Sequence, residues 1–339
     1  LNIVSREGET IKTALILNTS DSTIYNDKDA QLTINDVKIQ TTKGGYYSSG
    51  KYYRKSTIYN AGKLVTNENT EVLATNGYSY AIYNEGTYIC NSVNISTGEY
   101  GIYNKLGITQ ISNIAITKSI CNENGNLEIM GGTINADLQN YSEKESVISG
   151  GNISRLYNRE NGNLTIEAGT ISYIENYSSK DFDINNATIG NIINYKEGTV
   201  NLNNIKGSNG LTNRGTGIVN IINSTRSNVS FEGSGNIFIE NSTINNINNK
   251  NSATVYIKSG NVLNGITNSG TGTIQLGEDD DKEPNTVPEI NGKINMNSGI
   301  LNFYDGKIIG NPPVFANSIN IPKDSEIISN MENNNEVWT

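Results

Sequence analysis

Histidine is absent from this chain of 339 residues. A Ser-His-Asp triad, a histidine general base and a histidine metal site are therefore all excluded. Any catalysis would depend on carboxylates, Lys, Arg, Tyr or the two cysteines. This absence narrows the possible enzyme classes and favours a protein without a catalytic centre or a cofactor.

Cysteines and long apolar runs are also scarce. Two cysteines are too few for a disulfide scaffold, and no Cys-x-x-Cys spacing indicates zinc or redox chemistry. The sequence contains no run of about twenty apolar residues and no basic-then-apolar leader. We therefore expect no membrane insertion of this segment, and we expect any targeting or anchoring signal to lie outside it.

Positive charge and apolar residues are in short supply as well. The chain has 25 basic and 34 acidic residues, a formal charge of -9. A surface of this sign does not attract phosphates, so we expect no nucleic-acid partner. Hydrophobic residues make up 35 % and aromatic residues 7 % of the chain, which is little for two conventional cores.

Asn and Gly are abundant instead, with 57 and 34 copies. Both residue types favour turns over helices. An aliphatic residue two places before an Asn recurs along the chain, and from residue 102 onward the markers are 18 or 19 residues apart over nine steps. Such a fixed period is typical of a repeat fold. The markers are Ile24/Asn26, Ile58/Asn60, Ile82/Asn84, Ile102/Asn104, Ile120/Asn122, Leu138/Asn140, Leu156/Asn158, Ile174/Asn176, Ile192/Asn194, Leu211/Asn213, Ile247/Asn249 and Ile266/Asn268. Val229 occupies the remaining step, with Phe231 in place of the Asn.

Each unit reads as one coil of stacked strands. In residues 156–173 aliphatic residues occupy positions 1, 9, 11 and 16, and Leu164 and Ile166 alternate with Thr165 as in a strand with one buried face. Stacked coils at about 4.8 Å would bury these side chains. The sequence therefore predicts an all-β fold, a right-handed parallel β-helix with about 18 residues per coil and capped ends. We expect the following side chains in its interior: Leu164, Leu202, Ile221, Ile239 and Ile257.

Two other repeat folds fit less well. A left-handed hexapeptide helix needs an aliphatic residue at every sixth position, but the intervals here are 8, 2, 5 and 3. A leucine-rich repeat needs a Leu-x-Leu just before its Asn, and these units lack that pattern. The expected divisions are an N-terminal cap (1–23), β-helix coils (24–277), an acidic loop insertion (278–289) and a last coil with a C-terminal cap (290–339).

The repeats resemble those of a known family. Residues 162–171 (GNLTIEAGTI), 266–276 (ITNSGTGTIQL) and 297–308 (NSGILNFYDGKI) are similar to repeats of adhesin-like surface proteins of Gram-positive bacteria with a pectin-lyase-like β-helix. The resemblance covers residues 24 to 310. It implies an extracellular or cell-wall location, and a function as an adhesin, a spike or a polysaccharide-degrading enzyme.

Two segments depart from the repeat. Residues 41–57 (TTKGGYYSSGKYYRKST) extend one interval to 34 residues, as a loop or as a degenerate coil. The acidic loop contains Asp279, Asp280 and Asp281, whose carboxylates are the ligands that Ca²⁺ prefers. A run of acidic residues is more often a solvated loop, and this one lacks the glycines of known calcium loops.

Two columns run along the coils. The Asn at position 3 predicts a ladder of side-chain amides that bond coil to coil. Position 2 carries outward tyrosines that could bind glycans or host proteins, or could stack on each other and stiffen the sheet. The tyrosines are Tyr25, Tyr59, Tyr83, Tyr103 and Tyr157.

Candidates for catalysis are few. Asp181 and Asp183 flank Phe182 in a coil with Glu175, but no second acidic cluster aligns with them in neighbouring coils. Cys90 takes an inward position and Cys121 an outward one, which argues against a disulfide. We therefore expect a non-catalytic secreted or cell-surface adhesin or stalk. The alternative is a polysaccharide lyase or glycoside hydrolase on the same fold. A third function, ice binding, would need a more regular array of Thr than these coils have.

Overall fold

The computed structural model describes residues 2–4, 13–17, 22–42, 44–74, 78–207, 209–278, 287–309, 314–315, 319–320 and 326–329. Its elements are all strands. The chain divides into two compact units, Leu1–Ile174 and Glu175–Thr339. Strand β23 (Gly169–Asn176) contains residues of both.

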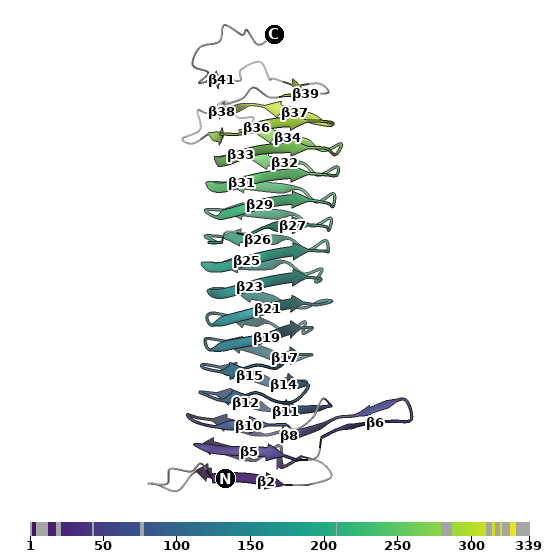
Figure 1. The fold of residues 1–339 in the computed structure, drawn as a ribbon, viewed down its shortest axis with the longest axis vertical. Coiled ribbons are helices and arrows are strands. Elements are labelled where there is room, and N and C mark those ends of the chain that lie inside the picture. Colours follow the sequence, from purple (N-terminus) through teal and green to yellow (C-terminus); the bar gives the residue numbers. More distant parts are fainter. Residues whose placement is uncertain are drawn as a thin grey trace. The chain divides into compact units, whose positions relative to one another are not determined.

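The first unit has two parallel sheets whose strands lie as rungs one above another (Figure 1). The first sheet contains β1 (Asn2–Val4), β4 (Gln31–Asn35), β9 (Lys63–Thr66), β12 (Thr87–Cys90), β15 (Ile108–Ile111), β18 (Asn126–Ile129), β20 (Ser146–Ile148) and β22 (Leu164–Ile166). The second sheet contains β2 (Thr13–Leu17), β3 (Ile24–Asn26), β5 (Val37–Thr41), β8 (Lys55–Asn60), β10 (Glu71–Leu73), β11 (Ser79–Asn84), β13 (Asn94–Ile95), β14 (Tyr100–Asn104), β16 (Ala115–Ile116), β17 (Ser119–Asn122), β19 (Thr133–Asn140) and β21 (Asn152–Asn158).

The second unit repeats this arrangement. One sheet contains β24 (Phe182–Asn185), β26 (Val200–Asn203), β28 (Val219–Ile222), β30 (Ile237–Glu240), β32 (Val255–Ile257), β34 (Thr273–Leu276), β37 (Ile300–Phe303) and β40 (Ile319–Asn320). The other contains β25 (Ala187–Asn194), β27 (Leu211–Asn213), β29 (Thr225–Phe231), β31 (Ser242–Asn249), β33 (Gly260–Asn268), β35 (Pro288–Ile290), β36 (Lys293–Met296), β38 (Asp305–Ile308), β39 (Val314–Phe315) and β41 (Glu326–Ser329).

Equivalent positions of successive coils are in register, as the constant marker spacing predicts. Leu202 pairs with Ile221, Ile221 with Ile239, and Ile239 with Ile257. These four side chains and Leu164 are at most 1 % exposed. The prediction of a right-handed parallel β-helix with this interior is therefore confirmed.

Corners of the coils use asparagine in the left-handed region. Asn186, Asn204, Asn223 and Asn241 recur once per coil with φ between 47° and 56°. Asn tolerates this conformation better than most side chains. The corner amides also bond to each other, from Asn204 to Asn186 at 2.7 Å and from Asn241 to Asn223 at 2.6 Å.

The Asn column at position 3 forms the predicted buried ladder. In the first unit each Nδ2 donates to the Oδ1 of the next coil at 2.7–3.1 Å, from Asn26 through to Asn158. In the second unit the ladder runs from Asn176 through Asn194 to Asn213. It stops at Phe231, which is fully buried in the column. The amide oxygens of the next two members, Oδ1 of Asn249 and Oδ1 of Asn268, are buried without a hydrogen-bond partner among the described residues.

The interruption gives a stability prediction. We expect Phe231→Asn to retain about 1–2 kcal/mol more unfolding free energy than Phe231→Ala, because the new amide can donate to Asn249. Urea unfolding followed by circular dichroism measures the difference. The matched control is Phe303, which is equally buried but lies in register with Leu276. There Asn should be no better than Ala, and an equal advantage at both sites contradicts the explanation.

The expected caps lie partly outside the described residues. Near the N-terminus, β1 pairs with β4 and β2 pairs with β5, so these strands extend both sheets. Near the C-terminus β39, β40 and β41 pair with β36, β37 and β38. The loop residues Asp279, Asp280 and Asp281 lie outside the described residues, so the calcium prediction stays a prediction.

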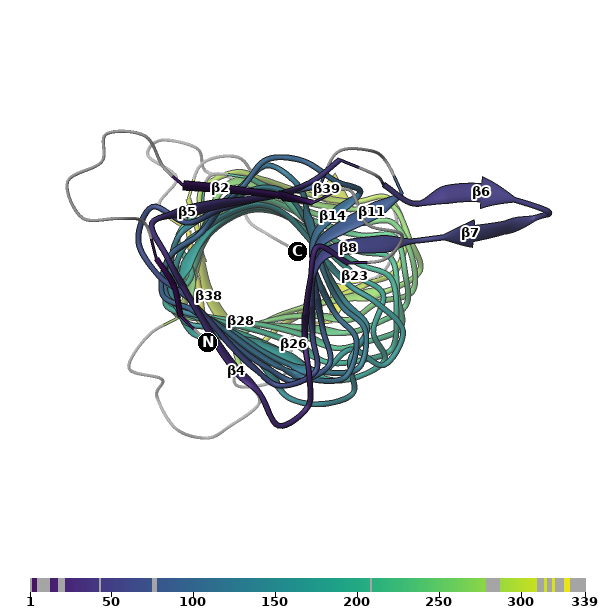
Figure 2. The same ribbon diagram turned by 90° about the horizontal axis from the view of Figure 1, so that it is seen from below.

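The insertion at residues 41–57 is a hairpin. Strands β6 (Tyr46–Ser48) and β7 (Lys51–Tyr53) pair antiparallel and project away from the coils (Figure 2). Between them Ser49 and Gly50 have φ of 50° and 76°. Two positive-φ residues form the tight turn that suits the twist of a hairpin. Of the two interpretations that the sequence allowed, the loop is confirmed.

Candidate functional site

Four of the five predicted site tyrosines lie together on β3, β8, β11 and β14. Tyr25, Tyr59, Tyr83 and Tyr103 are in register. Their rings stack at centroid distances of 4.8, 5.4 and 5.5 Å with interplanar angles of 3°, 13° and 9°. We call these four residues the tyrosine column. Stacking places a neighbouring ring on each face of Tyr59 and Tyr83, so those faces cannot stack on a sugar.

Tyr157 does not belong to this column. The positions that follow Tyr103 in register are Cys121 and Gln139, and only then Tyr157. The guanidinium of Arg159 lies 4.7 Å from the ring centroid of Tyr157. The fifth predicted residue therefore has a cationic neighbour in place of a stacked ring.

Carboxylates accept hydrogen bonds from the column's hydroxyls. Tyr59 donates to Glu85 and Tyr103 donates to Glu123, which also accepts from Lys105. Burial alone would raise the pKa of Glu123, but the bonds from Lys105 and Tyr103 outweigh it and hold this pKa below its usual range. Burial, together with the bond to Glu123, raises the pKa of Tyr103 well above its usual range. At neutral pH Tyr103 is therefore a neutral phenol that donates to an ionised Glu123.

A second row of rings lies beside the column. Tyr80 is 7 % exposed, and its ring centroid lies 4.7 Å from that of Tyr103 and 6.0 Å from that of Tyr100. Arg54 lies over the Tyr80 ring at 6.0 Å and donates to both carboxylate oxygens of Glu99 at 3.0 and 3.2 Å. Sequence reasoning did not assign these residues to the site. The available signal was a tyrosine three places before Tyr83 and Tyr103.

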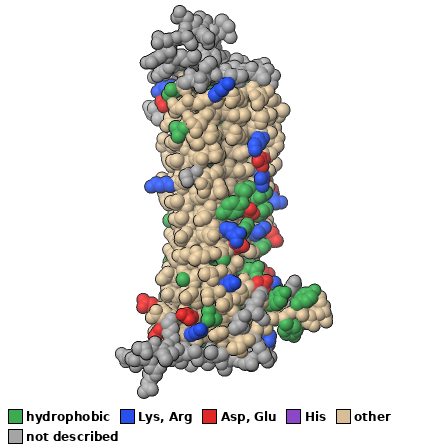
Figure 3. Space-filling model, in the orientation of Figure 1, with side chains coloured by type: hydrophobic (Ala, Val, Ile, Leu, Met, Phe, Trp, Pro, Cys, Tyr) green, Lys and Arg blue, Asp and Glu red, His purple; other side chains and the backbone are tan. Residues whose placement is uncertain are grey.

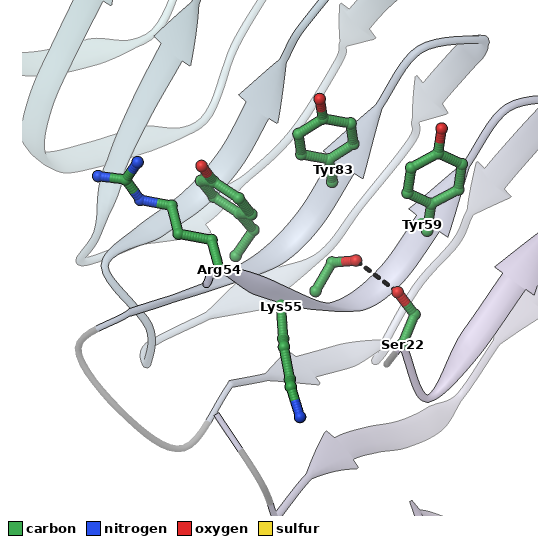
Figure 4. Close-up of a pocket in the computed structure, with 7 residues that line it drawn as sticks. Ser22, Arg54, Lys55, Tyr59 and Tyr83 are labelled. Atoms are coloured by element: carbon green, nitrogen blue, oxygen red, sulfur yellow. Dashed lines mark hydrogen bonds between the residues drawn. The ribbon is translucent and has the colours of Figure 1, made fainter. Parts of the chain in front are cut away.

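Two hollows flank Arg54, with volumes of about 420 and 480 Å³. In the smaller one, Tyr59 and Tyr83 stand side by side on neighbouring strands while Lys55 points away from them (Figure 4). The smaller hollow is lined by Ser22, Arg54, Lys55, Ser56, Tyr59, Tyr80 and Tyr83. The larger is lined by Arg54, Tyr100, Tyr103, Cys121, Glu123, Asn124, Tyr141 and Glu160. Both combine ring edges with hydroxyl and guanidinium groups, and the larger one adds the carboxylates of Glu123 and Glu160. Such a lining suits a polar ligand.

The cysteines are both free and buried, so they form no disulfide. Cys90 faces the interior, as expected. Cys121 occupies the outward register of Tyr103, as expected, but is only 4 % exposed. Burial raises the pKa of Cys90 to about 11 and that of Cys121 to about 12, so both are thiols at neutral pH. A thiol is a poor nucleophile compared with a thiolate.

The acidic candidates of β24 make structural bonds. Phe182 is fully buried, so Asp181 and Asp183 on either side share the outer face, as expected. The Asp183 carboxylate accepts from Nδ2 of Asn201 at 2.6 Å, and that of Asp181 accepts from the backbone of Thr199 at 3.0 Å. Within the described ranges no group of three or more Cys, Asp or Glu side chains is placed to hold a metal ion.

The buried phenols predict a dependence of stability on alkaline pH. Burial raises the pKa of Tyr80 to about 12, above the usual value of 10. The unfolded chain therefore loses this proton first, and the contribution to stability is complete below pH 10 and is lost as the pH rises toward 12. We expect the urea midpoint of Tyr80→Phe to fall less between pH 10 and 12 than that of the parent. Equal slopes would contradict this.

The part of the chain that the structure describes has no helix long and apolar enough to cross a membrane. Comparison with protein-family models, curated proteins and solved structures found no match to this chain.

Proposed function

We propose that this protein is a non-catalytic bacterial β-helix of the cell surface or the secreted fraction, and that it acts as an adhesin or stalk that binds glycans or host proteins. The observation that carries the proposal is the pair of tyrosine-lined hollows on either side of Arg54. The resemblance of the repeats to adhesin-like surface proteins supports the location. Regular coils with bonded amide ladders support the role of a stiff scaffold.

The hollows suit recognition because their groups are fixed. Arg54 is held by two hydrogen bonds to Glu99. The rings of Tyr59 and Tyr83 are held by stacking, and their hydroxyls are oriented by Glu85. Side chains that are already ordered lose little entropy when a ligand binds, which favours affinity.

The test pairs binding with turnover. The purified chain is applied to immobilised glucan, mannan, galactan and xylan and to a wider glycan array, and the same polysaccharides are assayed for depolymerisation. The proposal predicts binding without turnover. If the chain binds neither glycans nor host surface proteins, the adhesin function is wrong.

One observation favours the alternative of a polysaccharide lyase or glycoside hydrolase. Two carboxylates, Glu123 and Glu160, line the same hollow as Arg54, and paired carboxylates are the usual machinery of glycoside hydrolysis. The lowered pKa of Glu123 suits a base or nucleophile and not a proton donor. Depolymerisation that is lost in Glu123→Gln or Glu160→Gln would establish the enzyme and overturn the adhesin.

A further inference from the structure

Three tyrosines of the hairpin are more exposed than Tyr59, Tyr83 and Tyr103 of the tyrosine column. The end residue of the column, Tyr25, is itself 64 % exposed. We call residues 46–53 the hairpin arm. Tyr46, Tyr47 and Tyr53 are 51 %, 55 % and 44 % exposed. The space-filling view shows hydrophobic side chains gathered on this projection (Figure 3). In the column, by contrast, the faces of Tyr59 and Tyr83 are covered by their neighbours.

The register of the arm puts tyrosines on both of its faces. Tyr46 is opposite Tyr53 and their rings stack at 4.8 Å, while Tyr47 is opposite Tyr52. Because side chains alternate along a strand, Tyr47 lies on the other face from the Tyr46 and Tyr53 pair. A two-stranded hairpin with no sheet behind it is marginal in water. Exposed rings on both faces of such a hairpin therefore do not stabilise the protein alone, and they are typical of a surface that binds a ligand.

The base of the arm is held in place by the first unit. Arg54, the residue after β7, forms the two hydrogen bonds to Glu99. At the other end of the arm, a side chain on Gly45 would place its Cβ only 2.0 Å from the carbonyl oxygen of Tyr78 and 2.3 Å from that of Tyr53. The arm therefore leaves the coils at a fixed point beside the hollow that Arg54 lines.

We infer that the hairpin arm is the principal contact for a glycan chain, with Tyr47 stacking on a pyranose ring and the Tyr46 and Tyr53 pair meeting a second sugar. This inference rests on the proposed function and names its ligand class and its site. The arm has eight residues, 46–53, which is far fewer than the about 20–30 residues that each partner contributes to a standard protein interface. Tyrosine offers a rigid ring with a polar hydroxyl at low entropy cost, which suits the apolar face and the hydroxyl rim of a sugar.

The experiment measures the affinity of the full chain for whichever of the immobilised glucan, mannan, galactan and xylan it binds. The test variant is Tyr46→Ser with Tyr47→Ser, which leaves the Ser49 and Gly50 turn intact. A second variant replaces residues 46–53 by Gly-Ser-Gly-Ser. The matched control is Phe238→Ser with Tyr256→Ser, another outward pair of rings stacked at 4.6 Å, on β30 and β32.

We expect both arm variants to bind at least tenfold more weakly, with the control within twofold of the parent. If the arm variants keep the parent's affinity while the parent binds glycan, the inference is wrong and the proposed function stands. If the control loses as much affinity as the arm variants, the loss does not depend on the arm in particular, and the inference also fails. If the parent binds no polysaccharide, glycan recognition fails for the arm and for the protein together. Circular dichroism confirms that each variant is folded.

Discussion

Replacing Ile239 by Asp is expected to unfold the second unit or to lower its unfolding free energy by at least about 4 kcal/mol. Ile239 is 1 % exposed and lies in register between Ile221 and Ile257. A carboxylate there has the aliphatic side chains of Ile221 and Ile257 on the coils before and after it. Urea unfolding followed by the circular dichroism of β-structure measures the loss.

The neighbouring residue provides the control. Phe238 precedes Ile239 on β30 but faces out, with 41 % of its surface exposed. Phe238→Asp introduces the same charge on the same strand and should cost about 1 kcal/mol or less. If both variants lose stability equally, the interior assignment of Ile239 is wrong and the strand itself is sensitive to charge.

The interior was predictable because each buried side chain keeps a constant offset from its marker. Leu202 and Ile221 could be placed in one column from spacing alone, since a parallel stack turns equal sequence offsets into neighbours in space. The amide ladder was predictable for the same reason. Its end at Phe231 was visible in the sequence, but the unpaired oxygen on Asn249 follows only from the direction in which the amides donate.

The candidate site was predictable only in part. The register of Tyr59 and Tyr83 follows from the period, whereas the stacking of their rings depends on side-chain rotamers that no spacing fixes. Arg54 could not be placed because it belongs to the insertion, where the period is lost. The burial of Cys121 also has no signal in the repeat, because it comes from the larger hollow's neighbouring rings and not from the strand's alternation.

One interior position departs from the aliphatic rule. Arg226 is in register with the buried Ile244 and is itself only 1 % exposed, although its side chain is charged. On the coil before it the chain has Gly207, whose missing side chain leaves room for the guanidinium. Arg226 fills that space and donates to the carbonyl oxygens of Ile189, Gly190 and Gly210 at 2.9, 2.7 and 2.7 Å. Burial lowers the pKa of Arg226 to about 10, so it stays charged at neutral pH.

Arg226→Met is therefore expected to lower the unfolding free energy of the second unit by about 2–4 kcal/mol, although Met is apolar and the site is interior. The reason is that the carbonyl oxygens of Ile189 and Gly190 lose the guanidinium as donor, each at about 1–3 kcal/mol, while that of Gly210 keeps the backbone N–H of Ile192. The gain from removing a buried charge only partly offsets this loss. Arg226→Lys should recover little, because one ammonium on a flexible stem does not reproduce the planar fork that reaches three acceptors.

Arg214 shows what the same change costs where the guanidinium is not buried. Its side chain is 44 % exposed and pairs with Glu232 at 2.8 Å. An exposed ion pair contributes little to stability, so Arg214→Met should shift the urea midpoint only slightly. If Arg226→Met lowers the urea midpoint as little as Arg214→Met does, then water replaces the guanidinium over Gly207 and the arginine does not stabilise the fold. A large difference between the two variants means that a single interior arginine holds together the coils that meet at Ile189, Gly207 and Gly210.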